Sequence, residues 1–314
     1  MKTSLVSRLS LTDSPVPEAQ SRSLRTTRQP ASHRSLLRRT WNTIRSRPRF
    51  LISAPCVLLA VVCALFAPVL APRDPIAQDF SNILDPPSRH HLFGTDEFGR
   101  DILSRVIWGA RLSLGIAISA VAGALVLGGT MGMVGGFLRG PIDAALMRCI
   151  DAVMAFPGLI IVIALATALG PSHRAVIIGL TIAYTPVFAR LSRALVIRER
   201  NRDYVMAAVS IGQRQSRIVG THIAPNLALP VIVQTSLTLG SAMIAEASLS
   251  YLGLAAQPND PSWGRMVLHG RMVLEIAPHV TLIPLAVLAT VILAFNLFGD
   301  GLSDLLDPQL RRSL

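Results

Sequence analysis

Few residues in this chain of 314 have the types and the spacing that chemistry needs. Lys2 is the only lysine, whereas a phosphate-binding P-loop needs a lysine after its glycines to reach the β- and γ-phosphates. His90 and His91 are adjacent, so their side chains point in different directions and are expected at the surface rather than on a metal. No Cys-x-x-Cys pair completes a zinc site, because the three cysteines lie apart in apolar surroundings: Cys56, Cys63 and Cys149. We therefore expect no catalytic residue, no metal or cofactor bound by this chain, and no ATP hydrolysis through a P-loop.

Two groups of charged residues remain as candidates for binding. Asp96, Arg100, Asp101 and Arg105 alternate in sign at helical spacing, which predicts an amphipathic helix whose charges pair with one another or dock a partner. Glu246 is the only acidic residue well inside one of the long apolar stretches. A carboxylate there is costly unless it is paired or hydrated. Glu246 is therefore either a residue of a transport pathway or gate, or a carboxylate that faces water or pairs within an interface.

The composition predicts a membrane protein. The chain is 51% hydrophobic and 15% charged, with a mean hydropathy of +0.50, whereas soluble domains carry about 25% charged residues. About 20 apolar residues in a helix span the roughly 30 Å hydrocarbon core of a bilayer. The sequence has six such stretches, which predict an all-α polytopic protein with six transmembrane helices: 50–71, 112–137, 149–170, 175–195, 223–254 and 279–299.

Charge predicts the orientation and the domains. Residues 1–49 hold Lys2 and ten arginines against two acidic residues, so the positive-inside rule places the N-terminus in the cytoplasm. The basic tail precedes an apolar stretch and has Trp41 as its only aromatic residue, so membrane orientation is favoured over nucleic-acid binding. Six spans then place both termini inside. We expect a disordered cytoplasmic tail over 1–48, a transmembrane domain over 49–310 and a short cytoplasmic end, 311–314.

Two loops of this domain differ in charge. The 73–111 loop has five arginines against six acidic residues, which suits the outer side, and 190–217 has seven arginines against two, which suits the inner side. Within the spans, Pro157 and Pro186 are expected to kink or open their helices. The glycines of 128–136 stand three and four apart, which predicts close helix packing.

The inner loop 190–225 contains a short helical pattern from Asp203 to Gly212. Gly212 lies where such a helix would end in a left-handed cap. A short helix with small residues and a break is suited to contact by another protein. The residues expected to share one face are Tyr204, Ala207, Ala208 and Ile211.

This segment resembles the EAA loop of binding-protein-dependent ABC importer permeases. That pattern is Glu-Ala-Ala, three residues, Gly, then about nine residues to Ile/Leu-x-Pro. Here Ala207-Ala208 is followed by Gly212 and by Pro225, whereas Met206 stands where the family usually has Glu. Asp203-Tyr204-Val205 just before is typical of the peptide-importing branch.

Three further segments extend the resemblance over about 45–310. GTDEFGRDILSR at 94–105 is similar to the GTDxxGRDxxSR stretch of dipeptide, oligopeptide and nickel permeases. EASLSYLGL at 246–254, with PSWG at 261–264, resembles their fifth span and its exit. NLFGDGLSD at 296–304 resembles their C-terminus. The order of the four segments, the short first outer loop and the GTDxxGRD stretch resemble the C-type of the two paired permease subunits.

The resemblance implies a type I ABC importer permease fold in a bacterial inner membrane. The chain would form half of a pathway for di- or oligopeptides delivered by an extracytoplasmic solute-binding protein. Its partners would be a second homologous permease and two ATPase subunits or domains that hold ATP and Mg²⁺. The alternative to mutual pairing for Asp96, Arg100, Asp101 and Arg105 is then a docking surface for the solute-binding protein. The resemblance assigns ATPase coupling to Asp203, Tyr204, Met206, Ala207, Ala208 and Gly212.

Three alternatives stay open. The same machinery could carry nickel or another small solute, because such a permease receives its substrate from a separate binding protein. An ion-coupled secondary transporter is the main alternative class, although such carriers normally have inverted repeats and charged midplane residues, which this sequence lacks. A membrane enzyme would need a nucleophile or a metal constellation, which the predicted spans lack.

Overall fold

The computed structural model describes residues 48–255 and 259–306, and all their regular elements are helices. The all-α fold class is thus confirmed for this part of the chain. The predicted tail up to residue 47 and the end from 307 to 314 lie outside it.

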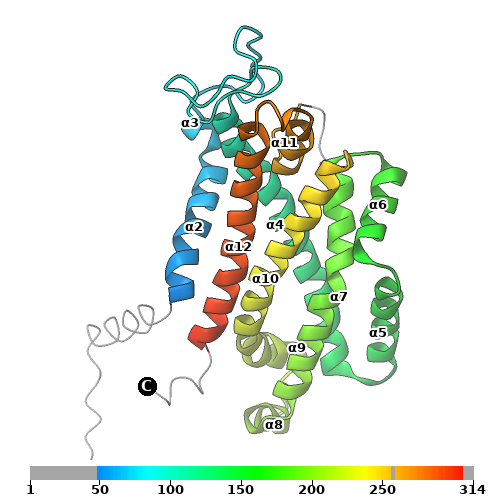
Figure 1. The fold of residues 1–314 in the computed structure, drawn as a ribbon. Coiled ribbons are helices and arrows are strands. Elements are labelled where there is room, and N and C mark those ends of the chain that lie inside the picture. Colours follow the sequence, from blue (N-terminus) through cyan, green and yellow to red (C-terminus); the bar gives the residue numbers. More distant parts are fainter. Residues whose placement is uncertain (1–47, 256–258, 307–314) are drawn as a thin grey trace, which may run out of the picture. The chain divides into compact units, whose positions relative to one another are not determined.

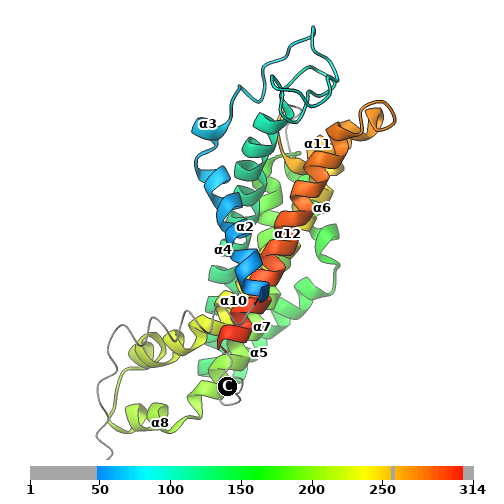
Figure 2. The same cartoon turned by 60° about the vertical axis from the view of Figure 1, so that its left-hand side comes forward.

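The helices run between two ends of the described region (Figure 1). We call one the loop end, where residues 71–101 and α11 lie, and the other the α8 end (Figure 2). The elements are α2 (Pro48–Leu65), α3 (Ala67–Leu70), α4 (Ile102–Leu138), α5 (Gly140–Met154), α6 (Gly158–Leu169), α7 (His173–Arg200), α8 (Asp203–Ser210), α9 (Gln215–Ile218), η2 (Val219–Ile223), α10 (Ala224–Tyr251), α11 (Trp263–Gly270), η3 (Arg271–Val273) and α12 (His279–Leu306).

The long helices occupy the predicted apolar stretches, but their number differs from six. In the described residues, four helices are long and apolar enough to cross a membrane: α4, α7, the continuous 215–251 segment that ends in α10, and α12. A fifth span is possible only if the bent pair of α5 and α6 is counted as one. The stretch 50–71 is not one helix, since α2 ends at Leu65 and α3 follows as a single turn with Pro68 in its first positions.

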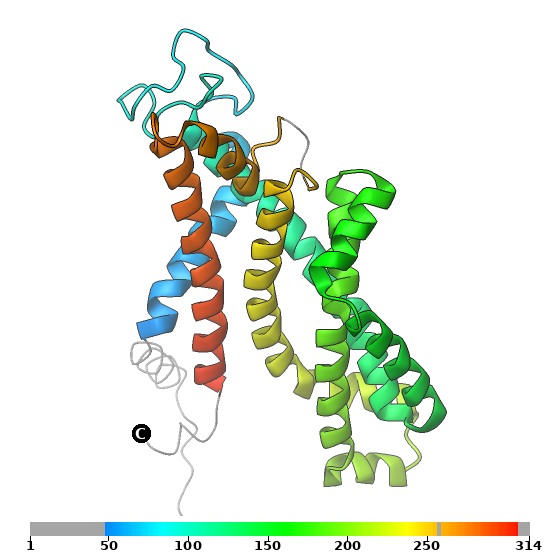
Figure 3. The same cartoon turned by 45° about the vertical axis from the view of Figure 1, so that its right-hand side comes forward.

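The prediction that residues 149–170 form one transmembrane helix is wrong. α5 and α6 meet at an angle of 80°, and Figure 3 shows them as two helices beside α7. The break falls at Phe156-Pro157, because proline has no N–H to donate and disfavours helical geometry in the residue before it. Pro186, in contrast, lies inside an unbroken α7.

Close helix packing is confirmed at the predicted glycines of α4, and the helix that packs on them is α7. A Cβ atom at Gly128 would collide with the carbonyl oxygen of Thr185, and one at Gly132 with that of Ala189. The absence of side chains at these two positions therefore lets the α4 and α7 backbones approach directly.

Both predicted loops are shorter than expected. α4 begins at Ile102, so residues 102–111 are helical rather than part of the outer loop. Similarly, α7 continues to Arg200, so the predicted inner loop consists of the three short helices α8, α9 and η2 and the residues that join them. The start of α4 is set by a capping side chain, because Asp101 accepts from the Ser104 N–H, and span periodicity alone does not reveal such a cap.

Candidate functional site

The helix at the α8 end has the predicted length and the predicted end. α8 runs from Asp203 to Ser210, and Gly212 has a φ of +74°. The Gly212 N–H donates to the Val209 carbonyl at 2.9 Å and the Gln213 N–H donates to the Ala208 carbonyl at 3.1 Å. These two bonds form a Schellman motif, so the left-handed cap is confirmed.

The faces of α8 differ from the prediction. Ala208 is only 6% exposed and, with Val205, joins a buried apolar cluster of this chain that includes Phe137 and Ile218. Ala208 therefore packs inwards, not on a face shared with Tyr204. The exposed residues of α8 and its C-cap are Asp203, Tyr204, Met206, Ala207, Val209, Ser210 and Ile211, of which Ile211 is 82% exposed.

Tyr204 joins α8 to two long helices. Its hydroxyl donates to Glu199 Oε2 on α7 at 2.9 Å and accepts from Asn226 Nδ2 on α10 at 3.0 Å. Burial, together with the hydrogen bond to the Glu199 carboxylate, raises the pKa of Tyr204. The hydroxyl is thus held protonated as a donor. A rigid displacement of α8 would pull on both α7 and α10 through this atom.

A cleft of about 840 Å³ lies next to α8. Its walls come from α8, from the chain around Gly212 and from Phe137 and Arg139 at the end of α4. Arg200 fixes one side, because its Nη1 donates to the Phe137 carbonyl at 2.6 Å. The exposed apolar side chains of α8 and this cleft form a surface suited to a partner protein.

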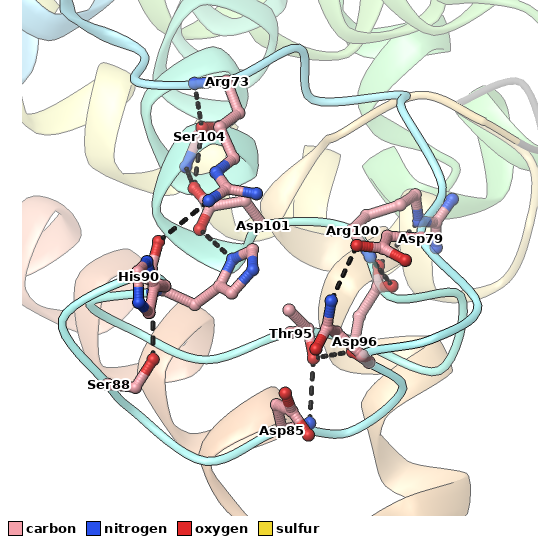
Figure 4. Close-up of polar contacts among 12 residues, drawn as sticks. Arg73, Asp79, Asp85, Ser88, His90, Thr95, Asp96, Arg100, Asp101 and Ser104 are labelled. Atoms are coloured by element: carbon pink, nitrogen blue, oxygen red, sulfur yellow. Dashed lines mark hydrogen bonds and ion pairs between the residues drawn. The ribbon is translucent and has the colours of Figure 1, made fainter.

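The four charged residues predicted near the first outer loop do come together, but not as one helix. Asp96 and Arg100 lie in the loop before α4, Asp101 is the N-cap of α4, and Arg105 is in its first turn. All four are buried, and because α4 begins only at Ile102, the predicted amphipathic helix over these four residues is wrong. Figure 4 shows Asp96 beside Arg100 and Asp101 beside Ser104.

These buried charges satisfy one another and the backbone. Asp96 accepts from Arg100 Nε at 2.7 Å and from two backbone N–H groups, while Arg105 Nη1 donates to the Pro75 carbonyl at 3.0 Å. Asp101 accepts from the Ser104 N–H at 2.8 Å and lies 3.0 Å from His91 Nδ1. Paired charges of this kind rigidify a loop.

The prediction that His91 lies at the surface is therefore wrong as well. It is 5% exposed and bonded to Asp101, not a surface side chain. The adjacent His90 is exposed, as predicted. The pairing joins residues ten positions apart through a loop, and periodicity in the sequence does not predict such a contact.

Glu246 is fully buried in α10. Ser250 Oγ donates to its Oε1 at 2.7 Å, and Ser262 Oγ lies 3.3 Å from Ser250 Oγ. Among the residues that the structure describes, Glu246 Oε2 has no hydrogen-bond partner. The carboxylate is thus enclosed within this chain, with the Ser250 hydroxyl bonded to one of its two oxygens.

Comparisons with known proteins agree with this geometry. The family model described as "Binding-protein-dependent transport system inner membrane component" matches residues 124–312, and "N-terminal TM domain of oligopeptide transport permease C" matches 35–87. The dipeptide transport system permease protein DppC of Alkalihalophilus pseudofirmus is 43% identical over 74% of this chain and 76% of its own length. The di/tripeptide permease DppC of Pseudomonas aeruginosa is 40% identical over 82% and 87%, respectively.

A third relative and a solved structure widen the comparison. The glutathione transport system permease protein GsiD of Pectobacterium atrosepticum is 38% identical over 74% of this chain and 77% of its own length. The inward-facing structure of the MetNI methionine ABC transporter has a chain that superposes with a TM-score of 0.51 at 15% identity, covering 66% of this chain and 98% of that one. The latter likeness concerns the fold. With a family model over more than half of its length, this chain belongs to the family of binding-protein-dependent transport system inner membrane components.

Proposed function

We propose that this chain is a non-catalytic permease subunit of an ATP-driven importer for short peptides. It would form half of the translocation pathway in a bacterial inner membrane, beside a second similar permease. The observation that carries the proposal is α8: a short helix with an exposed apolar surface, tied by Tyr204 to α7 and α10, in a chain whose only lysine is Lys2.

ATP would act through that helix. A chain without a P-loop lysine can still be driven if partner ATPases contact one of its rigid elements differently in two states. The two ATPase subunits or domains would hold ATP and Mg²⁺ and contact Tyr204, Met206, Ala207 and the Gly212 turn. Asp203 lies in the first turn, where a carboxylate interacts favourably with the helix dipole. Ala208 supports this surface from inside.

The loop end would receive a solute-binding protein. Because Asp96, Arg100, Asp101 and Arg105 are buried, we assign them to positioning the loop and not to direct contact. The surface offered to the binding protein would be the exposed apolar side chains that the loop carries: Ile76, Phe80, Ile83 and Leu92.

Orientation and substrate complete the proposal. Both termini would be cytoplasmic, and a reporter fused after residue 314 should be active only there. Peptides are proposed as cargo because two of the relatives are named as dipeptide and di/tripeptide permeases. Nickel or another small solute is the alternative cargo, because the solute-binding protein selects the substrate that is delivered to the permease.

Reconstitution tests the proposal. The purified chain in liposomes should show neither ATP-dependent nor gradient-driven uptake. The chain with its partner permease, both ATPases and the solute-binding protein should import radiolabelled dialanine only with ATP and Mg²⁺. Uptake by the chain alone under a proton or sodium gradient would overturn the proposal in favour of a secondary transporter.

A further inference from the structure

A second cleft, of about 980 Å³, opens beside α4 near the loop end. Its walls come from four separate parts of the chain: residues 68–76, the α4 segment 108–119, the start of α7, and Asp260-Pro261 before α11. Much of the lining is apolar, including Trp108, Leu112, Ile116 and Ile177. Small-molecule sites in proteins have this size and this mainly apolar character.

The cleft also carries charges that are not neutralised by one another. The Arg111 guanidinium lies 5.5 Å from the Trp108 ring centre, and no carboxylate of residues 48–255 or 259–306 lies within ion-pair distance of it. Asp74 Oδ1 accepts only from the backbone N–H of Ile76, at 2.9 Å, and it has no cationic partner in the same residues. Both side chains are exposed.

The remaining charged residues of the cleft are already occupied. His173 Nε2 lies 2.8 Å from Asp260 Oδ2, which ties the start of α7 to the chain before α11. Arg73 donates its backbone N–H to Ser104 Oγ at 3.0 Å and its Nη2 to the His90 carbonyl at 3.3 Å. These contacts hold the walls in place. In the described residues the Arg111 guanidinium makes no hydrogen bond and the Asp74 carboxylate is bonded only within its own turn, so these two groups are the most open to a ligand.

A ligand that suits this arrangement has an anionic end, a cationic end and a short apolar body. The planar guanidinium of Arg111 matches a carboxylate in a two-bond geometry, and a carboxylate such as Asp74 matches an ammonium group. The apolar wall suits short side chains. A free dipeptide or tripeptide has all three features.

We propose that this cleft binds short zwitterionic peptides, with Arg111 as the partner of the peptide's C-terminal carboxylate and Asp74 as the partner of its N-terminal ammonium group. The inference rests on the proposed function and adds a site to it. At the loop end, the cleft would receive a peptide on its way from the binding protein into the pathway.

The test removes the binding protein, which would itself select for peptide termini. The complete permease–ATPase complex in nanodiscs is titrated with radiolabelled dialanine, its C-terminal amide and its N-acetyl form by equilibrium dialysis. Wild type should bind dialanine at least about ten-fold more tightly than either blocked form, equivalent to about 1.4 kcal/mol. Subunit retention on size exclusion checks that every variant is assembled.

Two variants and one control separate the outcomes. Arg111→Gln should remove the preference for a free carboxylate, and Asp74→Asn the preference for a free amino group. Arg89→Gln, an exposed arginine that does not line the cleft, should change neither. A preference for the free carboxylate that survives in Arg111→Gln, or no saturable binding by wild type, overturns the site. If Arg111 only contacts the lipid surface at the membrane interface, wild type should show no saturable binding.

The failure of the site is distinguishable from the failure of the proposed function. If the wild-type complex with its binding protein imports dialanine with ATP but the nanodisc titrations show no effect of Arg111→Gln, only the site is wrong. If the complete wild-type complex imports no peptide with ATP, the proposed function is wrong as well.

Discussion

The hydroxyl of Tyr204 donates a hydrogen bond to the Glu199 carboxylate at 2.9 Å, which fastens α8 to the end of α7. The same oxygen accepts from Asn226, at the start of α10. Glu199 is only 7% exposed, and Arg198 and Arg202 lie 3.5 and 3.8 Å from it. The Glu199 carboxylate would therefore keep cationic neighbours if the Tyr204 hydroxyl were removed. Loss of this hydroxyl should therefore affect the transmission of α8 movement to α7 and α10 more than it affects folding.

Tyr204→Phe tests this transmission. Because the residue is 39% exposed, we expect a loss of only about 0.5–1.5 kcal/mol of stability. ATP hydrolysis should continue, while the number of ATP molecules hydrolysed per peptide imported rises several-fold. Tyr251→Phe is the matched control, because it also removes one hydroxyl, bonded to Arg271 at 2.7 Å near the loop end. An unchanged ratio in Tyr204→Phe would show that α8 moves the spans through other contacts.

Gly212 tests the partner surface. A Cβ placed there meets nothing of this chain within 4 Å, but a side chain at positive φ costs roughly 1–2 kcal/mol. Gly212→Asp should weaken ATPase binding by roughly 30- to 1,000-fold, the range for a disrupted hot spot. Gly212→Asn has the same shape without the charge, so the difference between the two isolates electrostatic repulsion. Subunit retention and substrate-stimulated ATP hydrolysis at wild-type levels in Gly212→Asp would contradict the assignment.

His269 predicts a pH dependence at the loop end. Burial lowers its pKa, against the opposing effect of Glu97, whose Oε1 lies 3.4 Å from His269 Nδ1. The folded chain therefore binds a proton less readily than the unfolded one, so stability should fall as the pH drops through about 6.5. Thermal unfolding between pH 8 and 5.5 measures this. His269→Gln should flatten the profile, and His90→Gln, at an exposed position, should not; equal slopes in wild type and His269→Gln would refute the prediction.

Glu246 tests whether the buried carboxylate takes part in transport. Glu246→Gln keeps an oxygen that accepts from Ser250, so we expect normal assembly but reduced import. Glu246→Leu leaves the buried Ser250 hydroxyl without that acceptor and should cost about 1–3 kcal/mol of stability. Glu275→Gln, at an exposed position, is the control. Wild-type import by an assembled Glu246→Gln complex would assign the carboxylate to packing alone.

Phe80 tests the docking surface. Its side chain is 67% exposed at the loop end, so Phe80→Asp should leave the fold intact and reduce stimulation of ATP hydrolysis by the solute-binding protein at least several-fold. Basal hydrolysis without the binding protein should be unchanged. Full stimulation in Phe80→Asp would place the docking surface elsewhere on the chain.

Much of the fold follows from the sequence alone. Apolar stretches of membrane length predicted where the long helices lie, the glycines of 128–136 predicted close helix packing on α4, and Gly212 predicted the left-handed end of α8. Each of these predictions depends on residue types and on their spacing along the chain, whereas the choice of α7 as the helix that packs on Gly128 and Gly132 does not. Features that depend on residue types and spacing can be predicted directly from the amino-acid sequence.

Only the tertiary structure decided which side chains meet. It buried Ala208, placed Tyr204 against Asn226 across 22 positions, and turned the predicted helix of Asp96 and Arg100 into the interior of a loop. Periodicity shows that a helix has distinct faces, but it does not show which face another part of the chain covers. Alternating charges can form ion pairs within a folded loop just as they can along a helix. These outcomes depend on contacts between distant segments, which exist only once the helices have packed.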